Sequence, residues 1–302
     1  MCLSRRDFLK GAAVTAGALV LPAGLARPAR AAGGEPVLVS IFLRGAADGL
    51  NLVVPHGDPR YYEIRPHIGT ELDLDGFFGL HPALAPLLPI YQAGRLAVVH
   101  AFGSPDPTRS HFEGQDFMDR GAPGDFTVYD GWLNRYLQAV GAETSLSAVS
   151  IGNAKSLSLT GAAPSLSFSS LADFRLAGRF PSQRRAAVQQ MYESVQATLL
   201  GRSAGELLEA VDQVAAIQND SVVAYPDTEF GRALRDVAAL IRADLGVRVV
   251  AVNLGGWDHH ERAPENMARG LPELARALAR SAAAPAAEAG GGRDGTAAEA
   301  GR

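Results

Sequence analysis

The sequence predicts an α/β protein in which helices cover a mostly parallel sheet. Short apolar segments alternate with longer amphipathic ones along most of the chain. The strand-length segments carry few polar residues, which indicates strands buried on both faces, as in parallel sheets. With 302 residues, 47% of them hydrophobic, the chain is long enough to bury a sizeable core.

The first half of the expected domain begins with an apolar run at 36–44 (PVLVSIFLR) that predicts a strand. A Gly-containing turn and a second apolar piece, 50–55, follow it. The Pro-, Gly- and Tyr-rich stretch 56–66 predicts a loop. We expect a helix over 81–94 and a buried strand over 95–102 (RLAVVHAF).

The second half continues the same alternation. Apolar residues spaced three and four apart predict helices, and β-branched runs predict strands. The expected helices cover 110–120, 131–139, 181–217 and 229–245, and the expected strands cover 146–151 and 247–254. Ligands of parallel α/β sheets bind beyond the carboxyl ends of the strands, so the loops after the strands are the places to look for a site.

The N-terminus predicts a twin-arginine signal peptide over 1–31. Arg5 and Arg6 precede a weakly apolar segment, and Ala29-Arg30-Ala31 has the form of a cleavage site. The apolar segment is too short to span a bilayer, so we expect no stable membrane anchor. The expected partner during export is the twin-arginine translocon, and the expected location is periplasmic or extracellular.

The other end of the chain predicts an Ala/Gly-rich disordered tail over 281–302, which leaves 32–280 as the α/β domain. The net charge of −4 and the lack of a basic run argue against nucleic acid as a partner. Cys2 is the only cysteine, so the chain can form no internal disulfide.

Polar residues follow three of the expected strands. Asp48 lies in a Gly-flanked turn, where it is either a metal ligand or the cap of its own turn. Arg109, Ser110 and His111 lie where a Pro-rich loop enters a helix. Ser110 there is either a nucleophile in the field of the helix N-terminus or, with Glu113 three residues on, a capping box.

The third group is Asp258-His259-His260, directly after Gly255-Gly256-Trp257. Asp and His side chains two residues apart can face one metal ion, and zinc and iron accept this mixture of ligands. His81 and His100 are weaker candidates, because a helix start and a strand are both places where a histidine serves a structural role.

Four segments together resemble a known family. They are LRGAADGLNLVVPHGDPRYY (43–62), FFGLHPALAPLLPIYQAGRLAVVHAFGSPDPTRSHFEGQDFMDRG (77–121), DGWLNR (130–135) and NLGGWDHH (253–260). The chain resembles the bacterial exported proteins of domain-of-unknown-function family 1501, in the alkaline phosphatase and sulfatase-like clan. The resemblance implies a three-layer α/β fold and one or two divalent metals such as zinc, manganese or calcium.

By position, Asp48 matches the clan's first carboxylate, Ser110 its nucleophile, and Asp258 with His260 its Asp-x-His. His259 stands where the family has another residue, which leaves open which histidine is the ligand. The resemblance also implies a further strand and an Asp-His-Gly-His-type motif, in place of which this chain has the Ala/Gly-rich tail. We therefore expect a sheet that is incomplete at the C-terminus.

These features lead to three functional hypotheses. The first is a metal-dependent hydrolase of phosphate or sulfate esters, with Arg109 binding an anionic small-molecule or polymer substrate. The second is an exported protein that uses the fold for binding or assembly without catalysis. The third is an inactive, truncated gene product.

Overall fold

The computed structural model describes residues 36–66, 71–142, 144–176, 178–217 and 223–290. Its main sheet has four strands in the order β1 (Leu38–Leu43), β7 (Val249–Leu254), β5 (Ala148–Ile151) and β6 (Leu166–Phe168). All three pairings are parallel. The predicted α/β class with a mostly parallel sheet is therefore confirmed.

Helices and short strands make up the rest of the described chain. The α-helices are α2 (Gly49–Leu52), α3 (Pro59–Ile64), α4 (Leu88–Gln92), α5 (His111–Arg120), α6 (Trp132–Ala139), α7 (Pro181–Glu193), α8 (Leu199–Ala215), α9 (Glu229–Ala243) and α10 (Ala263–Gly290). Three 3-10 helices are η1 (Pro82–Leu87), η2 (Ser145–Ser147) and η3 (Leu157–Leu159). A small antiparallel sheet has the order β2 (Val53–Val54), β4 (Gly79–Leu80) and β3 (Leu72–Asp73).

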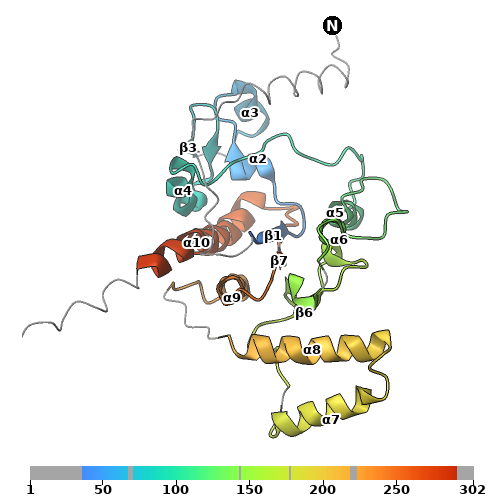
Figure 1. Cartoon of the computed structure of the whole chain (residues 1–302). Coiled ribbons are helices and arrows are strands. Elements are labelled where there is room, and N and C mark those ends of the chain that lie inside the picture. Colours follow the sequence, from blue (N-terminus) through green and yellow to red (C-terminus); the bar gives the residue numbers. More distant parts are fainter. Residues whose placement is uncertain (1–35, 67–70, 143, 177, 218–222, 291–302) are drawn as a thin grey trace, which may run out of the picture.

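Helices lie on both faces of the main sheet, with α9 and α10 on one side and α5 and α6 on the other (Figure 1). The side chains of β7 alternate between these layers, as the two-residue period of a strand requires. Val249 and Ala251 pack with the leucines of α6. Val250 and Val252 pack with the apolar faces of α9 and α10 in the larger core. Because both faces are covered, the strand needs no polar residue until it ends.

Two predicted elements took a different form. The stretch 56–66, expected as a loop, contains α3, which Asp58 caps and Pro59 opens at a position where the helix needs no N–H donor. The predicted helical region 181–217 is divided into α7 and α8, because the Thr198 side chain accepts from the N–H of Gly201 and starts a new helix.

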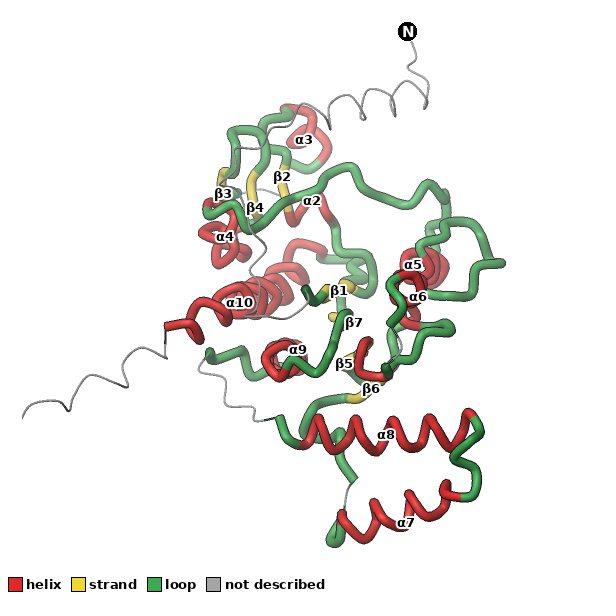
Figure 2. Tube along the Cα trace, in the orientation of Figure 1, coloured by secondary structure: helices red, strands yellow, loops and turns green. Residues whose placement is uncertain are grey.

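The expected strand over 95–102 is wrong. Residues 95–102 form no strand and follow α4 as an extended connection towards α5 (Figure 2). The side chain of Val99 is 77% exposed. In the sequence this apolar, β-branched run looks like a buried strand, but no strand of the described chain pairs with it, and periodicity alone cannot supply a partner.

The helix α10 extends to Gly290, so residues 281–290 of the expected disordered tail are helical. Alanine has the highest helix propensity, and this segment is rich in it, which explains why the helix continues. The remainder of the expected tail, 291–302, and the predicted signal peptide, 1–31, lie outside the described residues. The predicted incompleteness of the sheet stays a prediction.

The helices α7 and α8 form a hairpin that projects from the body of the domain (Figure 1). No residue of α7 is buried, whereas α8 buries one face. A cavity of about 570 Å³ lies between them, lined among others by Arg175, Arg185 and Asp212. None of the helices in the described ranges combines the length and hydrophobicity that crossing a bilayer requires.

Candidate functional site

The loops that follow β1 and β7 lie against each other at the carboxyl end of the sheet. The N–H of Trp257 donates to the carbonyl of Arg44 at 3.1 Å. Gly45 has φ +108°, and a Cβ added to it would lie 2.9 Å from the Cβ of Asp258. Only glycine combines this backbone conformation with such a close approach. The backbone contacts of Arg44 and Gly45 therefore position Asp258 beside the end of β1.

An ion pair with a buried carboxylate connects these loops to α5. Arg44 forms a bidentate pair with Asp119, with Nη1 to Oδ2 at 2.5 Å and Nη2 to Oδ1 at 3.1 Å. Asp119 is 3% exposed. The Nε of Arg44 also donates to the side-chain carbonyl of Asn253 in β7 at 2.9 Å. One guanidinium thus bonds to a residue of β7, which ends at the site, and to a residue of α5, which begins there.

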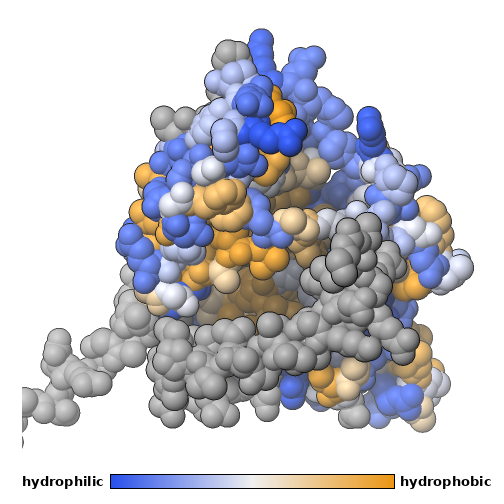
Figure 3. All heavy atoms as spheres, turned by 90° about the horizontal axis from the view of Figure 1, so that it is seen from above, coloured by the Kyte–Doolittle hydropathy of each residue, from blue (hydrophilic) through white to orange (hydrophobic). Residues whose placement is uncertain are grey.

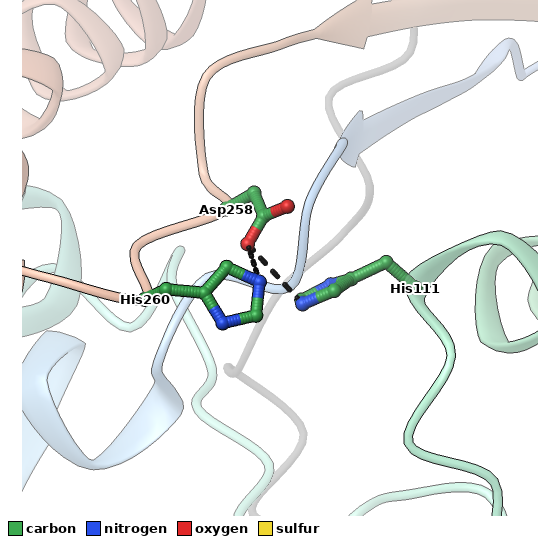
Figure 4. Close-up of side chains that lie close together, drawn as sticks. All are labelled: His111, Asp258 and His260. Atoms are coloured by element: carbon green, nitrogen blue, oxygen red, sulfur yellow. Dashed lines mark ion pairs between the residues drawn. The ribbon is translucent and has the colours of Figure 1, made fainter.

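Within this frame, three side chains converge (Figure 4). The Oδ1 atom of Asp258 lies 2.8 Å from Nε2 of His260 and 3.2 Å from Nε2 of His111. The two imidazole rings meet edge to face with centroids 5.1 Å apart. One ligand atom from each residue lies within 4.8 Å of the others. In the described ranges this is the only cluster of at least three His, Cys, Asp or Glu side chains with such spacing.

The cluster is open to solvent. The side chain of His111 is 28% exposed, that of Asp258 48% and that of His260 74%. Such exposed ion pairs add little to stability, because water screens them and the side chains lose freedom when they pair. Stability alone therefore does not explain why three ligand-type side chains meet here.

His259 lies outside the cluster. Its Nε2 lies 2.8 Å from the carbonyl oxygen of Gly256, so the side chain closes its own turn. His260, one residue on, points toward Asp258 and His111 (Figure 4). Of the two adjacent histidines, His260 is therefore the one that the geometry places with Asp258.

Asp48 has partners of its own. Its Oδ1 accepts from the N–H of Leu50 and caps α2. Its Oδ2 lies 2.6 Å from Nη1 of Arg65 and 3.1 Å from the side-chain nitrogen of Asn51. It is not in the cluster. The turn-capping role that the sequence offered as an alternative is present in the structure.

Ser110 directly precedes His111 and is the N-cap of α5. Its hydroxyl accepts from the N–H of Glu113 at 3.3 Å, while the Glu113 carboxylate accepts from the hydroxyl of Thr108 at 2.6 Å. The capping role is therefore present, although Glu113 bonds to Thr108 rather than back to the cap. Arg109 is exposed, and no partner for its side chain occurs in the part of the chain that the structure describes.

The two weaker histidine candidates lie elsewhere. His81 caps η1, with Nδ1 accepting from the N–H of Ala83 at 3.1 Å, and burial lowers the pKa of its imidazole. His100 stacks on Phe78 with ring centroids 4.2 Å apart. The sequence did not predict the roles of Arg44, Asp119 and Asn253. Nothing in their spacing shows that the Arg44 guanidinium bonds to both of the other side chains.

The fold and the cluster define an α/β protein with a His–Asp–His group at the carboxyl edge of a parallel sheet. A family model described as protein of unknown function (DUF1501) matches residues 100–283, more than half of the chain, and the chain therefore belongs to this family. A model of the twin-arginine translocation signal sequence matches residues 2–22.

The match to the signal sequence confirms the predicted export route and location. The chain is exported across the membrane by the twin-arginine translocase to the periplasm or the extracellular space. No curated protein and no solved structure matches the chain.

Proposed function

We propose that this exported protein binds a divalent metal ion through His111, Asp258 and His260 and uses it to hydrolyse phosphate or sulfate esters. The convergence of these three side chains from segments more than a hundred residues apart carries the proposal. As part of the same proposal, we assign the chain the alkaline phosphatase-like fold and clan that the sequence motifs suggest.

The donor set favours zinc or manganese over calcium. Calcium prefers six to eight oxygen ligands, whereas two imidazoles and one carboxylate match a three-ligand zinc site with an open position. Zinc bonds of about 2.0–2.2 Å keep any two ligand atoms within roughly 4 Å of each other. A separation of up to 4.8 Å between the exposed side chains requires only a small closing movement.

Two neighbouring residues fit the hydrolase reading. When bound, the metal would polarise an ester oxygen and stabilise developing negative charge. The hydroxyl of Ser110 lies at the N-terminus of α5, where the helix field favours negative charge, and it directly precedes His111. The exposed guanidinium of Arg109 is free to pair with an anionic substrate.

Calorimetric titration of the full chain with zinc and with manganese tests the metal centre. We expect one ion per chain, at least about tenfold weaker binding in His111→Ala or His260→Ala, and unchanged binding in His259→Ala. His259→Ala is the matched control, because the adjacent imidazole it removes hydrogen-bonds to Gly256 and, among the described residues, to no member of the cluster. Equal binding in all four proteins would overturn the metal centre.

Turnover of aryl phosphates and aryl sulfates by the metal-loaded protein tests the hydrolase. We expect turnover that Ser110→Ala abolishes and that Ser110→Thr, which keeps a capping hydroxyl, partly retains. Metal binding without any turnover by the unmodified protein would refute catalysis and leave the metal centre intact.

A second candidate function is metal-dependent binding without chemistry. The observation that favours it is that Asp48 and Ser110 both have structural partners, the first in Arg65 and the cap of α2, the second in the cap of α5. On this reading, Ser110→Ala lowers helix stability but leaves the metal affinity and any metal-dependent phenotype unchanged.

A further inference from the structure

We propose that two copies of the chain associate by strand exchange, in which residues 96–100 of one copy pair with the outer edge of β1 in the other. The inference does not depend on the metal centre. It rests on two unpaired features of the fold, one with the sequence of a strand and the other with a free strand edge.

The first feature is the connection that follows α4. Its sequence, LAVVH, has the β-branched and apolar residues typical of strands. Among the described residues, the backbone N–H groups of 96–102 donate to no acceptor. Val99 is 77% exposed, so its isopropyl group contacts water in a single copy. Ala101 has φ +54°, which marks the end of any strand there.

The second feature is the outer edge of β1. This strand ends the order of the main sheet, and no strand pairs with its outer side in the described chain. Its sequence is LVSIFL, yet its residues are half-buried or exposed, whereas Val249–Val252 of the neighbouring β7 are all buried. An apolar edge strand with free N–H and C=O groups is a template for pairing with another chain.

The two features lie apart in one chain. The connection leaves α4 and crosses on the far side of α2 from β1 (Figures 1 and 2). Seen from above Figure 1, the molecule exposes hydrophobic residues at its surface and in a hollow (Figure 3). A single chain would have to move the connection past α2 to pair it with its own β1.

A second copy resolves both features at once. In a symmetric pair each chain donates its 96–100 segment and accepts that of its partner, which gives a closed interface in which both unpaired features disappear. A foreign peptide bound to β1 would leave the backbone N–H groups of residues 96–100 without acceptors. The complementarity of donor and edge within one sequence therefore points to a copy of this chain as the occupant.

Disulfide trapping tests the contact directly. The only native cysteine, Cys2, is replaced by serine, and one protein then carries Val99→Cys while a second carries cysteine at one of positions 39–42 of β1. A bridge requires Cβ atoms about 3.5–4.5 Å apart, so it reports strand neighbours. We expect mixed oxidation to give a heterodimer for at least one β1 position.

Two results of this trapping would overturn the proposal. One is cross-linking of Val99→Cys only to itself, which would place two connections side by side. The other is an internal bridge in a monomeric double variant, which would place the segment on β1 of its own chain.

Light scattering across a concentration series supplies the second test. Val99→Pro removes the N–H that pairing needs, and we expect self-association at least about tenfold weaker. Val99→Thr keeps the N–H and the β-branch and should still dimerise. The melting temperature at low concentration checks that both variants fold, since the N–H of Val99 has no acceptor among the described residues of a single copy. A chain that stays monomeric at every concentration would contradict the inference.

Discussion

At the scale of single residues, the geometry of the candidate site depends on the backbone conformation of the loop that follows β1. Gly45 adopts φ +108° and Ala46 φ +65°, two consecutive left-handed residues directly after β1. A non-glycine residue in this region carries strain that the surrounding structure must hold, and such strain gathers at functional sites. Here it lets the first loop approach the backbone of Asp258.

We predict that Gly45→Ala destabilises the fold by more than about 1 kcal/mol and weakens metal binding, because the new Cβ must displace Asp258. Thermal unfolding and zinc titration measure the two effects. Gly49→Ala is the control, since a Cβ there meets nothing within 4 Å. Equal behaviour of the two variants would mean that the contact at Gly45 does not position Asp258.

We also predict that Asp48→Ala lowers stability by about 1 kcal/mol, the usual effect of removing an N-cap. Asp48→Asn should cost less, because its side-chain oxygen still accepts from Leu50 and the lost ion pair with Arg65 is partly exposed. Denaturant unfolding measures both. An equal loss in Asp48→Asn and Asp48→Ala would show that the charge contributes more to stability than the cap.

At the scale of elements, α5 is held in place by a charge rather than by an extensive apolar face. Its buried residues are Phe117 and Asp119, and Asp119 pairs with Arg44 at the end of β1. His111 is on the first turn of this helix, so the Arg44–Asp119 pair helps to position one candidate ligand.

We predict that Arg44→Met destabilises the protein by about 3 kcal/mol or more, because it leaves the Asp119 carboxylate buried without a partner. The double variant Arg44→Met with Asp119→Leu should recover a large part of this loss. Chemical unfolding of both variants gives the comparison. No recovery in the double variant would show that Arg44 acts mainly through Asn253 or through packing on Phe42.

The His81 cap makes η1 sensitive to pH. Burial lowers the pKa of His81 below its ordinary 6.5, and the protonated ring cannot accept from Ala83. The pKa of His81 is lower in the folded than in the unfolded chain. The stability that neutral His81 contributes is therefore fully present above about pH 6.5, and it is lost as the pH falls through the lowered pKa.

We therefore expect His81→Asn, which keeps an acceptor but does not titrate, to lose less stability than the unmodified chain between pH 7 and pH 5. Melting temperatures across this range test the expectation. Parallel losses in the two proteins would contradict it.

At the scale of the whole molecule, stability is concentrated around the parallel sheet and falls towards the α7–α8 hairpin. The strands β7 and β5 are buried on both faces, whereas α7 buries no residue. A region with few buried contacts opens at low free energy.

Native-state hydrogen exchange should therefore show protection that is greatest in β5 and β7, intermediate in α8 and least in α7. Exchange at α7 as slow as at β7 would indicate that a partner covers the hairpin in solution.

Sequence reasoning predicted the elements whose signal is local. The strand at β7 and the helix α9 were expected within a few residues of their bounds, because their apolar periods and end signals lie within the elements themselves. The segment 95–102 carries an equally strong local signal, yet it needs a neighbouring strand, and sequence spacing does not show whether one exists.

For the site, residue types were easier to predict than partnerships. Asp258, His260 and His111 were all expected as candidates, and the structure brings them together. Asp48 and Ser110 were expected with two alternatives each, and the capping alternatives are present. The Arg44–Asp119 pair could not be predicted, because both residues are ordinary charged positions until the loops meet.

Trp257 is one of only two tryptophans in the chain. It is 2% exposed, lies 3.5 Å from where a Cβ on Gly270 would stand, and directly precedes Asp258. Its indole N–H has no acceptor within the described chain. The molecule thus contains a fluorophore one peptide bond from the cluster, and after Trp132→Phe it would be the sole emitter. A change in its emission on adding zinc would give an optical titration of site occupancy without any label.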